Sequence, residues 1–194
     1  EVHVAAGGFG SIRHVESGET MHAHTSPIEE ARTLYVEQAQ LRERVRLSGN
    51  ANPDEAAPLV IWDVGLGAAA NALAAIHCYQ EEAEGGAVRG LRMVSFENDL
   101  DALRLACQNI KHFPYLRHGG PGGLLERGAW HSKKFPRLHW NLVGGDFRES
   151  MQSAAHPPDL IFYDPFSSRT NGFAWTLESF RRLFAACEDR DVEV

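Results

Sequence analysis

Apolar and polar positions follow a regular pattern from residue 59 onward, where short apolar runs alternate with amphipathic segments. The apolar runs have the length of buried strands, and they cover residues 59–64, 91–97, 138–143 and 158–164. The amphipathic segments have helical spacing, and they cover residues 72–82, 101–113, 147–155 and 175–187. This alternation predicts an α/β fold, in which a mostly parallel sheet carries helices on both faces.

Two of these amphipathic segments, residues 101–113 and 175–187, predict stripes of side chains that face the core. These inward positions are Leu100, Leu103, Cys107 and Ile110 in one segment, and Phe180, Leu183, Phe184 and Cys187 in the other. The last four residues, DVEV, have the character of a further strand. A doubly wound sheet normally continues beyond this point, so the C-terminal strands are expected to be missing.

The N-terminal part has a different pattern. Two short β-like runs flank the turn at residues 7–10 and predict a hairpin. Ser26, Pro27 and Glu29 have the spacing of a capping box, which predicts a helix over residues 26–45. We therefore expect an N-terminal hairpin and helix, residues 1–52, packed on or covering a site in a larger unit, residues 53–194, within one globular whole. The segment 114–137 is rich in Gly, Pro and His and is expected to loop out of the core.

Composition and charge narrow the function classes. The formal net charge is −7, so contact with nucleic acid would need a local basic patch. Three cysteines lie far apart in the sequence, which argues against a disulfide framework and predicts a reducing, cytoplasmic location. No apolar run approaches the roughly 20 residues that cross a bilayer. His22 and His24 have no further ligand at a recognisable spacing, so no metal site is predicted.

The glycine turn after the first buried strand carries the main functional signal. Gly65 and Gly67 lie where ligands bind in an open α/β sheet, at the carboxyl end of a strand. Two interpretations compete: the loose dinucleotide pattern G-x-G-x-x-A, and a loop for S-adenosylmethionine. Glu97, which ends the second strand, would bind ribose hydroxyls in either case. Asp63 is not part of the dinucleotide fingerprint, so it favours the methyl donor, and an NAD-dependent oxidoreductase is the alternative.

The pattern D-x-G-x-G, followed by an acid at the end of the next strand, resembles motifs I and II of class I S-adenosylmethionine-dependent methyltransferases. This resemblance implies a Rossmann-like fold and an enzyme that transfers a methyl group. It also implies an adenine contact for Asp146 and Phe147, although Asp146 could instead cap the helix that follows it. The cofactor-binding residues that it implies are Asp63, Gly65, Gly67, Asn71, Glu97, Asp146 and Phe147.

Asp164 ends the fourth strand, where the transferred methyl group should lie. The run Asp164-Pro165-Phe166 is similar to the D/N-P-P-Y/F motif of amino-methyltransferases, in which a carboxylate or amide accepts hydrogen bonds from the target amine. Methyl transfer needs alignment of the nucleophile and removal of one proton. Asp164 is therefore the predicted catalytic residue, and its alternative is an acid in a strand-end turn.

A closer resemblance is to the methyltransferase half of the MnmC-type tRNA 5-aminomethyl-2-thiouridine enzymes. Two motifs carry it: Gly65, Gly67, Ala69, Asn71 and Leu73, with alanine at the third glycine, and Asp164, Phe166, Asn171 and Trp175. Glu29, Glu30 and Tyr35 resemble a third, less well spaced group. The resemblance implies N-methylation of a modified wobble uridine, with Glu30, Phe166, Asn171 and Trp175 near the substrate. Ser168, Thr170 and Gly172 depart from the family pattern.

A local basic segment offers a candidate tRNA surface. Residues 111–137 hold six Lys and Arg side chains against one acid, Glu126, and Trp130, Phe135 and Trp140 lie in or beside them. Aromatic side chains can stack on bases. The alternative for this segment is a solvated insert, and the alternative for the chain is a methyltransferase-like domain that binds without turnover.

Overall fold

The structure is a computed structural model that describes residues 1–21, 25–49, 51–187 and 190–194. In this part of the chain, the main sheet has five strands in the order β5-β6-β4-β3-β7. These strands are β3 (Leu59–Val64), β4 (Leu91–Glu97), β5 (Ala129–His131), β6 (Leu138–Gly144) and β7 (Leu160–Tyr163). All neighbours pair in parallel except β5, which is antiparallel to β6. The four predicted strands are confirmed; β3, β4 and β7 are largely buried, and β6 is buried at Leu138 and Trp140.

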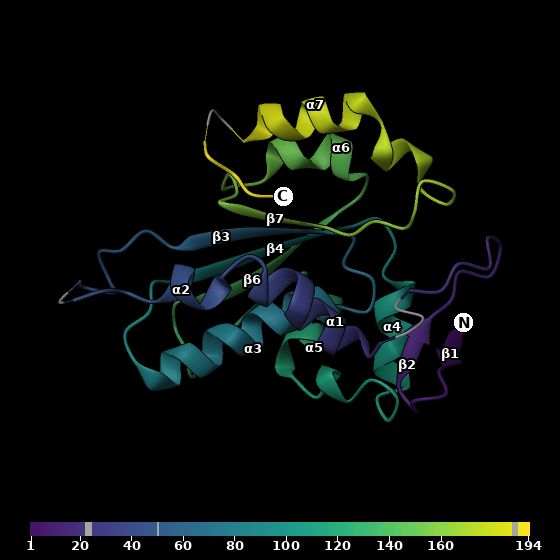
Figure 1. Cartoon of the computed structure of the whole chain (residues 1–194), viewed down its shortest axis with the longest axis horizontal. Helices are drawn as coiled ribbons and strands as arrows, with labels where there is room; N and C mark the ends of the chain where they lie inside the picture. The colour runs from purple at the N-terminus through teal and green to yellow at the C-terminus, as the bar shows by residue number, and fades with distance from the viewer. Residues whose placement is uncertain (22–24, 50, 188–189) are drawn as a thin grey trace.

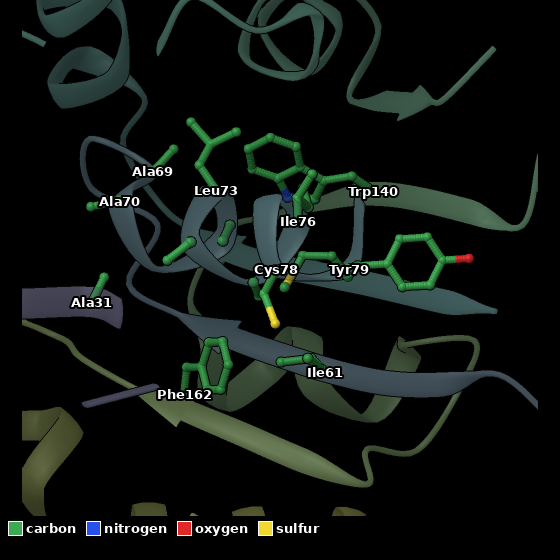
Figure 2. Close-up of a cluster of buried hydrophobic side chains, with 14 of the residues drawn as sticks. Ala31, Ile61, Ala69, Ala70, Leu73, Ile76, Cys78, Tyr79, Trp140 and Phe162 are labelled. Atoms are coloured by element: carbon green, nitrogen blue, oxygen red, sulfur yellow. The ribbon is translucent and has the colours of Figure 1, made fainter. Parts of the chain in front are cut away.

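Helices cover both faces of this sheet (Figure 1). One face carries α3 (Ala70–Gly85), α5 (Gly119–Arg127) and the N-terminal helices, and the other carries α6 (Phe147–Ser150) and α7 (Leu177–Ala186). Side chains alternate along β3: Leu59 and Ile61 join the larger core under α3, whereas Val60, Trp62 and Val64 join the core under α7. Figure 2 shows part of the larger core, where Leu73 and Ile76 of α3 lie beside Trp140 of β6, and Ile61 and Phe162 come from the neighbouring strands β3 and β7.

The N-terminal part forms the predicted hairpin, but its helix is divided. Strands β1 (Val2–Val4) and β2 (Gly10–Ile12) pair in antiparallel fashion. The predicted helix over residues 26–45 consists of α1 (Pro27–Ala31), a π-helical turn η1 (Arg32–Glu37) and α2 (Leu41–Val45). Gln40 interrupts it with a left-handed backbone, φ +50°. Ser26 occupies the N-cap position, but its side chain makes no capping hydrogen bond with the described residues, so the predicted capping box is wrong.

The expectation that residues 114–137 loop out of the core is wrong. The segment forms a short 3-10 helix, η2 (Pro114–Leu116), then α5, and then strand β5 at the sheet edge. Two glycines of α5 are required by close packing. A Cβ on Gly120 would lie 2.6 Å from the ring of Trp140, and a Cβ on Gly123 would lie 2.9 Å from Cβ of Trp130. Glycine suggested a loop, but here it lets a helix approach two tryptophans.

The remaining elements lie near the carboxyl ends of the strands and at the C-terminus. They are α4 (Asp101–Gln108), η3 (Met151–Ser153) and η4 (Gly172–Trp175). Ile110 is 38% exposed and Phe184 is 61% exposed, so these two predicted core positions are wrong. Glu193 forms a parallel bridge with Leu160 of β7, which agrees with strand character at the C-terminal end. Within the described residues, no helix combines the length and apolar character needed to span a membrane.

Candidate functional site

A cavity of about 710 Å³ opens at the carboxyl ends of the parallel strands. The loops that follow β3, β4, β6 and β7 line it, and residues 12–16 of the N-terminal part form a further wall. The predicted site residues that line the cavity are Gly65, Gly67, Glu97, Asp146, Phe147, Asp164, Phe166 and Asn171. Of the other predicted residues, Asp63, Asn71, Glu30 and Trp175 are not among the described residues that line it. The structure thus brings together most of the predicted site, while the roles of these residues stay predictions.

The turn after β3 depends on its glycines. Gly65 has φ +90° and Gly67 has φ +50°, which side chains rarely allow. A Cβ on Gly65 would lie 2.6 Å from the carbonyl oxygen of Asp164, so this turn packs directly on the backbone after β7. Ala69 also has a left-handed backbone, φ +63°, at the position where the family pattern has its third glycine. An alanine in this conformation is strained by roughly 1–2 kcal/mol.

Glu97 is held against this turn by backbone amides. Its Oε2 accepts a hydrogen bond from the Gly67 amide at 3.0 Å. Its Oε1 accepts hydrogen bonds from the amides of Asn98 at 2.9 Å and Asp99 at 3.2 Å. Burial raises the pKa of Glu97, against the opposing effect of these amides. The carboxylate is therefore fixed at the end of β4 and faces the cavity.

Asp63 is buried beneath the turn. In the parallel register it lies opposite Ser95 of β4, whose hydroxyl donates a hydrogen bond to Oδ2 at 2.6 Å. Ser95 in turn accepts a hydrogen bond from Trp140 Nε1 at 2.9 Å. Asp63 Oδ1 has no hydrogen-bond partner among the described residues. Burial raises the pKa of Asp63 to about 7; the nearby Asp164 and Glu97 also raise it, and Ser95 lowers it. Asp63 thus combines complete burial with one oxygen that can still accept a donor.

Asp164 follows β7 and lies next to side chains of the N-terminal and central helices. Asn71 Nδ2 donates a hydrogen bond to Asp164 Oδ2 at 2.8 Å. Tyr35 is also near Asp164, because burial and then the charge of Asp164 raise the pKa of Tyr35. Sequence reasoning placed Asn71 at the cofactor and named Tyr35 only through the family resemblance. Their common contact with Asp164 is seen only in the tertiary structure.

Asp146 caps the helix that follows it, as its alternative interpretation predicted. Its Oδ1 accepts a hydrogen bond from the Arg148 amide at 2.9 Å, and the Arg148 guanidinium pairs with the same carboxylate. This pair lowers the pKa of Asp146. The guanidinium also lies over the ring of Phe173, 4.6 Å from its centre. Arg148 and Phe173 line the cavity, and no sequence motif indicated either of them.

The segment before the first helix also contributes to the cavity. Met21 lines it, and the Met21 side chain would lie 3.2 Å from a Cβ on Gly67. Glu19 accepts hydrogen bonds from the Ser167 amide and hydroxyl, both at 2.9 Å, and from the Thr170 hydroxyl at 2.5 Å. Residues 18–21 therefore join the N-terminal part to the loop after β7. His22 and His24 lie outside the described residues.

The basic segment 111–137 does not form part of the cavity wall that the structure describes. Arg137 pairs with Asp54 at 2.7 Å, and Lys134 pairs with Glu84. Trp140 is fully buried, so the expectation that it could stack on a base is wrong. Within the described residues, no group of three or more His, Cys, Asp or Glu side chains is arranged to hold a metal ion.

Comparison with known proteins identifies the fold. No family model matches the sequence, and no curated protein sequence matches it. Among solved structures, the chain resembles MnmC2 from Aquifex aeolicus, with a TM-score of 0.66 and 24% identity over 98% of this chain and 56% of that chain. It also matches the S-adenosylhomocysteine-bound methyltransferase PaMTH1 from Podospora anserina, with a TM-score of 0.40 and 12% identity over 82% of this chain and 54% of that one.

The chain spans just over half the length of each of these two structures. The likeness to MnmC2 shows a shared fold, and at this identity it shows no more than the fold. The chain is therefore a Rossmann-like α/β protein with a cavity at the carboxyl ends of its parallel strands. The predicted fold class is confirmed.

Proposed function

We propose that this chain binds S-adenosylmethionine in the cavity and methylates an amine. The observation that carries the proposal is the charge of the cavity. Among the described lining residues, the acids outnumber the arginines seven to two. The acids are Glu1, Glu16, Glu97, Asp99, Asp101, Asp146 and Asp164, and the arginines are Arg13 and Arg148. Such a cavity favours a cation, and the cofactor carries both a sulfonium and an ammonium group.

The contact between Gly67 and Glu97 argues against a dinucleotide. A pyrophosphate in a Rossmann-like turn is bound by backbone amides at the start of the helix. Here the Gly67 amide already donates to the Glu97 carboxylate at 3.0 Å. A pyrophosphate at this turn would lie beside that negative charge and would compete for the same donor. This contact therefore supports the methyl donor over NAD.

The residues present fit the proposed cofactor. The left-handed glycines leave the backbone of the turn open to a ligand, and Glu97 presents a fixed carboxylate for ribose hydroxyls. The buried Oδ1 of Asp63, which has no partner among the described residues, can accept a hydrogen bond from a donor in or beside the turn. Phe147 and Asp146 would flank the adenine base of the cofactor. The cofactor, when bound, would supply an activated methyl group at a positively charged sulfur.

Asp164 is the proposed catalytic residue. Its carboxylate lies at the end of β7 and lines the cavity. It would accept a hydrogen bond from the acceptor amine, which directs the nitrogen lone pair toward the methyl carbon. As the nitrogen–carbon bond forms and the carbon–sulfur bond breaks, Asp164 would take the proton that the nitrogen loses. The step thus yields a methylated amine, a neutral thioether and a protonated carboxyl group.

We propose a modified uridine of tRNA as the acceptor. Two observations support this: the motif from Asp164 to Trp175, and the fold likeness to MnmC2. Phe166 and Asn171 line the cavity beside Asp164. Trp175 donates a hydrogen bond from Nε1 to the Phe166 carbonyl at 2.8 Å, so it would stabilise the loop that follows β7 and carries Phe166. Phe166 also lies against His14, with ring centres 5.6 Å apart, which gives this wall an aromatic surface.

Calorimetric titration with S-adenosylhomocysteine, and in parallel with NADH, tests the cofactor. We expect micromolar binding of S-adenosylhomocysteine and no binding of NADH. Binding of NADH alone would overturn the proposal in favour of an oxidoreductase. Undermodified tRNA and labelled S-adenosylmethionine then test the acceptor, and tRNA lacking the target uridine is the control. Cofactor binding with no turnover on any amine would instead indicate a binding domain.

A further inference from the structure

The carboxylate of Asp164 is held on the side of the sheet that faces α3. The Asp164 amide donates to the Val64 carbonyl at 2.9 Å, so the strand geometry of β7 continues through this residue. Phe162, two residues earlier, faces the core under α3, as Figure 2 shows. Because side chains alternate along a strand, Asp164 points to the same side as Phe162. The first turn of α3 and the turn η1 lie on this same side of the sheet, next to Asp164 and Phe162.

Asn71 contacts this carboxylate from α3. Its Nδ2 donates to Asp164 Oδ2 at 2.8 Å, and the residue is only 5% exposed. Among the described residues, Asn71 is not part of the cavity lining. A buried amide that donates to a carboxylate and does not line the cavity is suited to orient that carboxylate. The sequence had placed Asn71 among the cofactor ligands.

Tyr35 lies near the same carboxylate on the N-terminal side. It is part of the π-helical turn η1, and such turns often occur at functional sites. Its ring packs on Phe162 with centres 4.8 Å apart, and burial and then the charge of Asp164 raise the pKa of its hydroxyl. Asp63 on β3 and Glu30 on α1 are the other charged groups near it. An amide and a phenol hydroxyl thus approach Asp164 from separate elements.

We propose that Asn71 and Tyr35 are positioning residues that orient the Asp164 carboxylate toward the cavity and keep it ionised. This inference rests on the proposed function, in which Asp164 accepts the proton of the amine. Hydrogen-bond donors favour the ionised form of a carboxylate. Loss of the Asn71 amide or of the Tyr35 hydroxyl should therefore weaken proton acceptance by Asp164 without removing a contact to the cofactor.

The test uses Asn71→Leu and Tyr35→Phe, each with a matched control. Asn109→Leu removes an amide that donates to the Leu105 carbonyl at 2.9 Å, away from the cavity. Tyr79→Phe removes a buried hydroxyl of α3. The first measurement is the pH titration of the Asp164 side-chain carbon by NMR, assigned through its loss in Asp164→Asn. We expect its midpoint to move up by about one pH unit in each test variant and to stay unchanged in the controls.

The second measurement is the affinity for S-adenosylhomocysteine, which separates positioning from cofactor binding. Affinity should stay within about 3-fold of the wild type in both test variants, while kcat on tRNA falls roughly 10- to 100-fold, as expected for impaired general base catalysis. The KM for S-adenosylmethionine should change little. Asn71→Gln keeps the amide donor and should restore part of kcat. If Asn71→Leu does not fold, Tyr35→Phe removes a single oxygen and carries the same test.

Two results would overturn the inference. One is an unchanged Asp164 titration in both test variants, because then neither donor acts on the carboxylate. The other is a loss of S-adenosylhomocysteine affinity of about 10-fold or more in Asn71→Leu, which would make Asn71 a cofactor ligand. A wild-type protein that does not bind S-adenosylhomocysteine would overturn the proposed function itself. The NMR titration needs no ligand, so it separates that failure from a failure of the two positioning residues.

Discussion

Replacing Gly65 by alanine should be the most damaging single-methyl change in the glycine turn. Two costs combine at this position. The backbone has φ +90°, a conformation that costs a residue with a Cβ roughly 1–2 kcal/mol. The new Cβ would also lie 2.6 Å from the Asp164 carbonyl oxygen and 3.1 Å from Cα of Pro165. These are backbone atoms that cannot turn aside, so overpacking adds roughly 1–3 kcal/mol.

A matched control separates these two costs. Gly128 ends α5 with φ +69°, and a Cβ there would have no described atom within 4 Å. Gly128→Ala therefore carries only the conformational cost. We expect Gly65→Ala to lower the free energy of unfolding by about 3 kcal/mol and Gly128→Ala by about 1 kcal/mol. For a chain of this size these values correspond to falls in Tm of roughly 6–12 °C and 2–4 °C.

Urea unfolding followed by circular dichroism, with Tm measured in parallel, is the assay. Gly65→Ala should also reduce S-adenosylhomocysteine binding, because the backbone that must move forms one side of the cavity. Gly128→Ala should leave binding unchanged. Equal destabilisation by the two substitutions would refute the reasoning, since it would mean that the contact with Asp164 has no cost of its own.

Three further predictions follow from the same site. Ala69→Gly should raise the free energy of unfolding by about 1 kcal/mol, because it relieves the left-handed alanine; a lower Tm would contradict this. Asp63 has a folded-state pKa of about 7, above its unfolded value, so the stability that it contributes is present at low pH and is lost as the pH rises through 7. Asp63→Asn should therefore flatten the fall in Tm between pH 4 and pH 7, and an unchanged slope would count against a raised pKa. Asp164→Asn should abolish methylation and leave S-adenosylhomocysteine affinity nearly unchanged; equal loss of both would indicate a structural role.

The sequence by itself predicted four of the five strands that the structure describes in the main sheet, and it missed β5. The runs at 59–64 and 91–97 were assigned with their observed bounds, because a strand buried on both faces is a nearly continuous apolar run. The glycine turn could be located because its neighbours in the chain form a strand and a helix. Since parallel strands end at one edge of the sheet, the acids at positions 97, 146 and 164 line one cavity.

The tertiary structure alone decided which partner each polar group takes. Ser95 donates to Asp63 across 32 positions of the chain, and Asn71 donates to Asp164 across 93 positions. The helix α5 was missed because glycine locally disfavours a helix. Gly120 and Gly123 are needed there because a larger side chain would collide with Trp140 or Trp130. Periodicity along the chain records which side of an element is buried, and this is a local property. Hydrogen bonds and close approaches between distant segments depend on how the elements pack, so no local pattern of the sequence contains them.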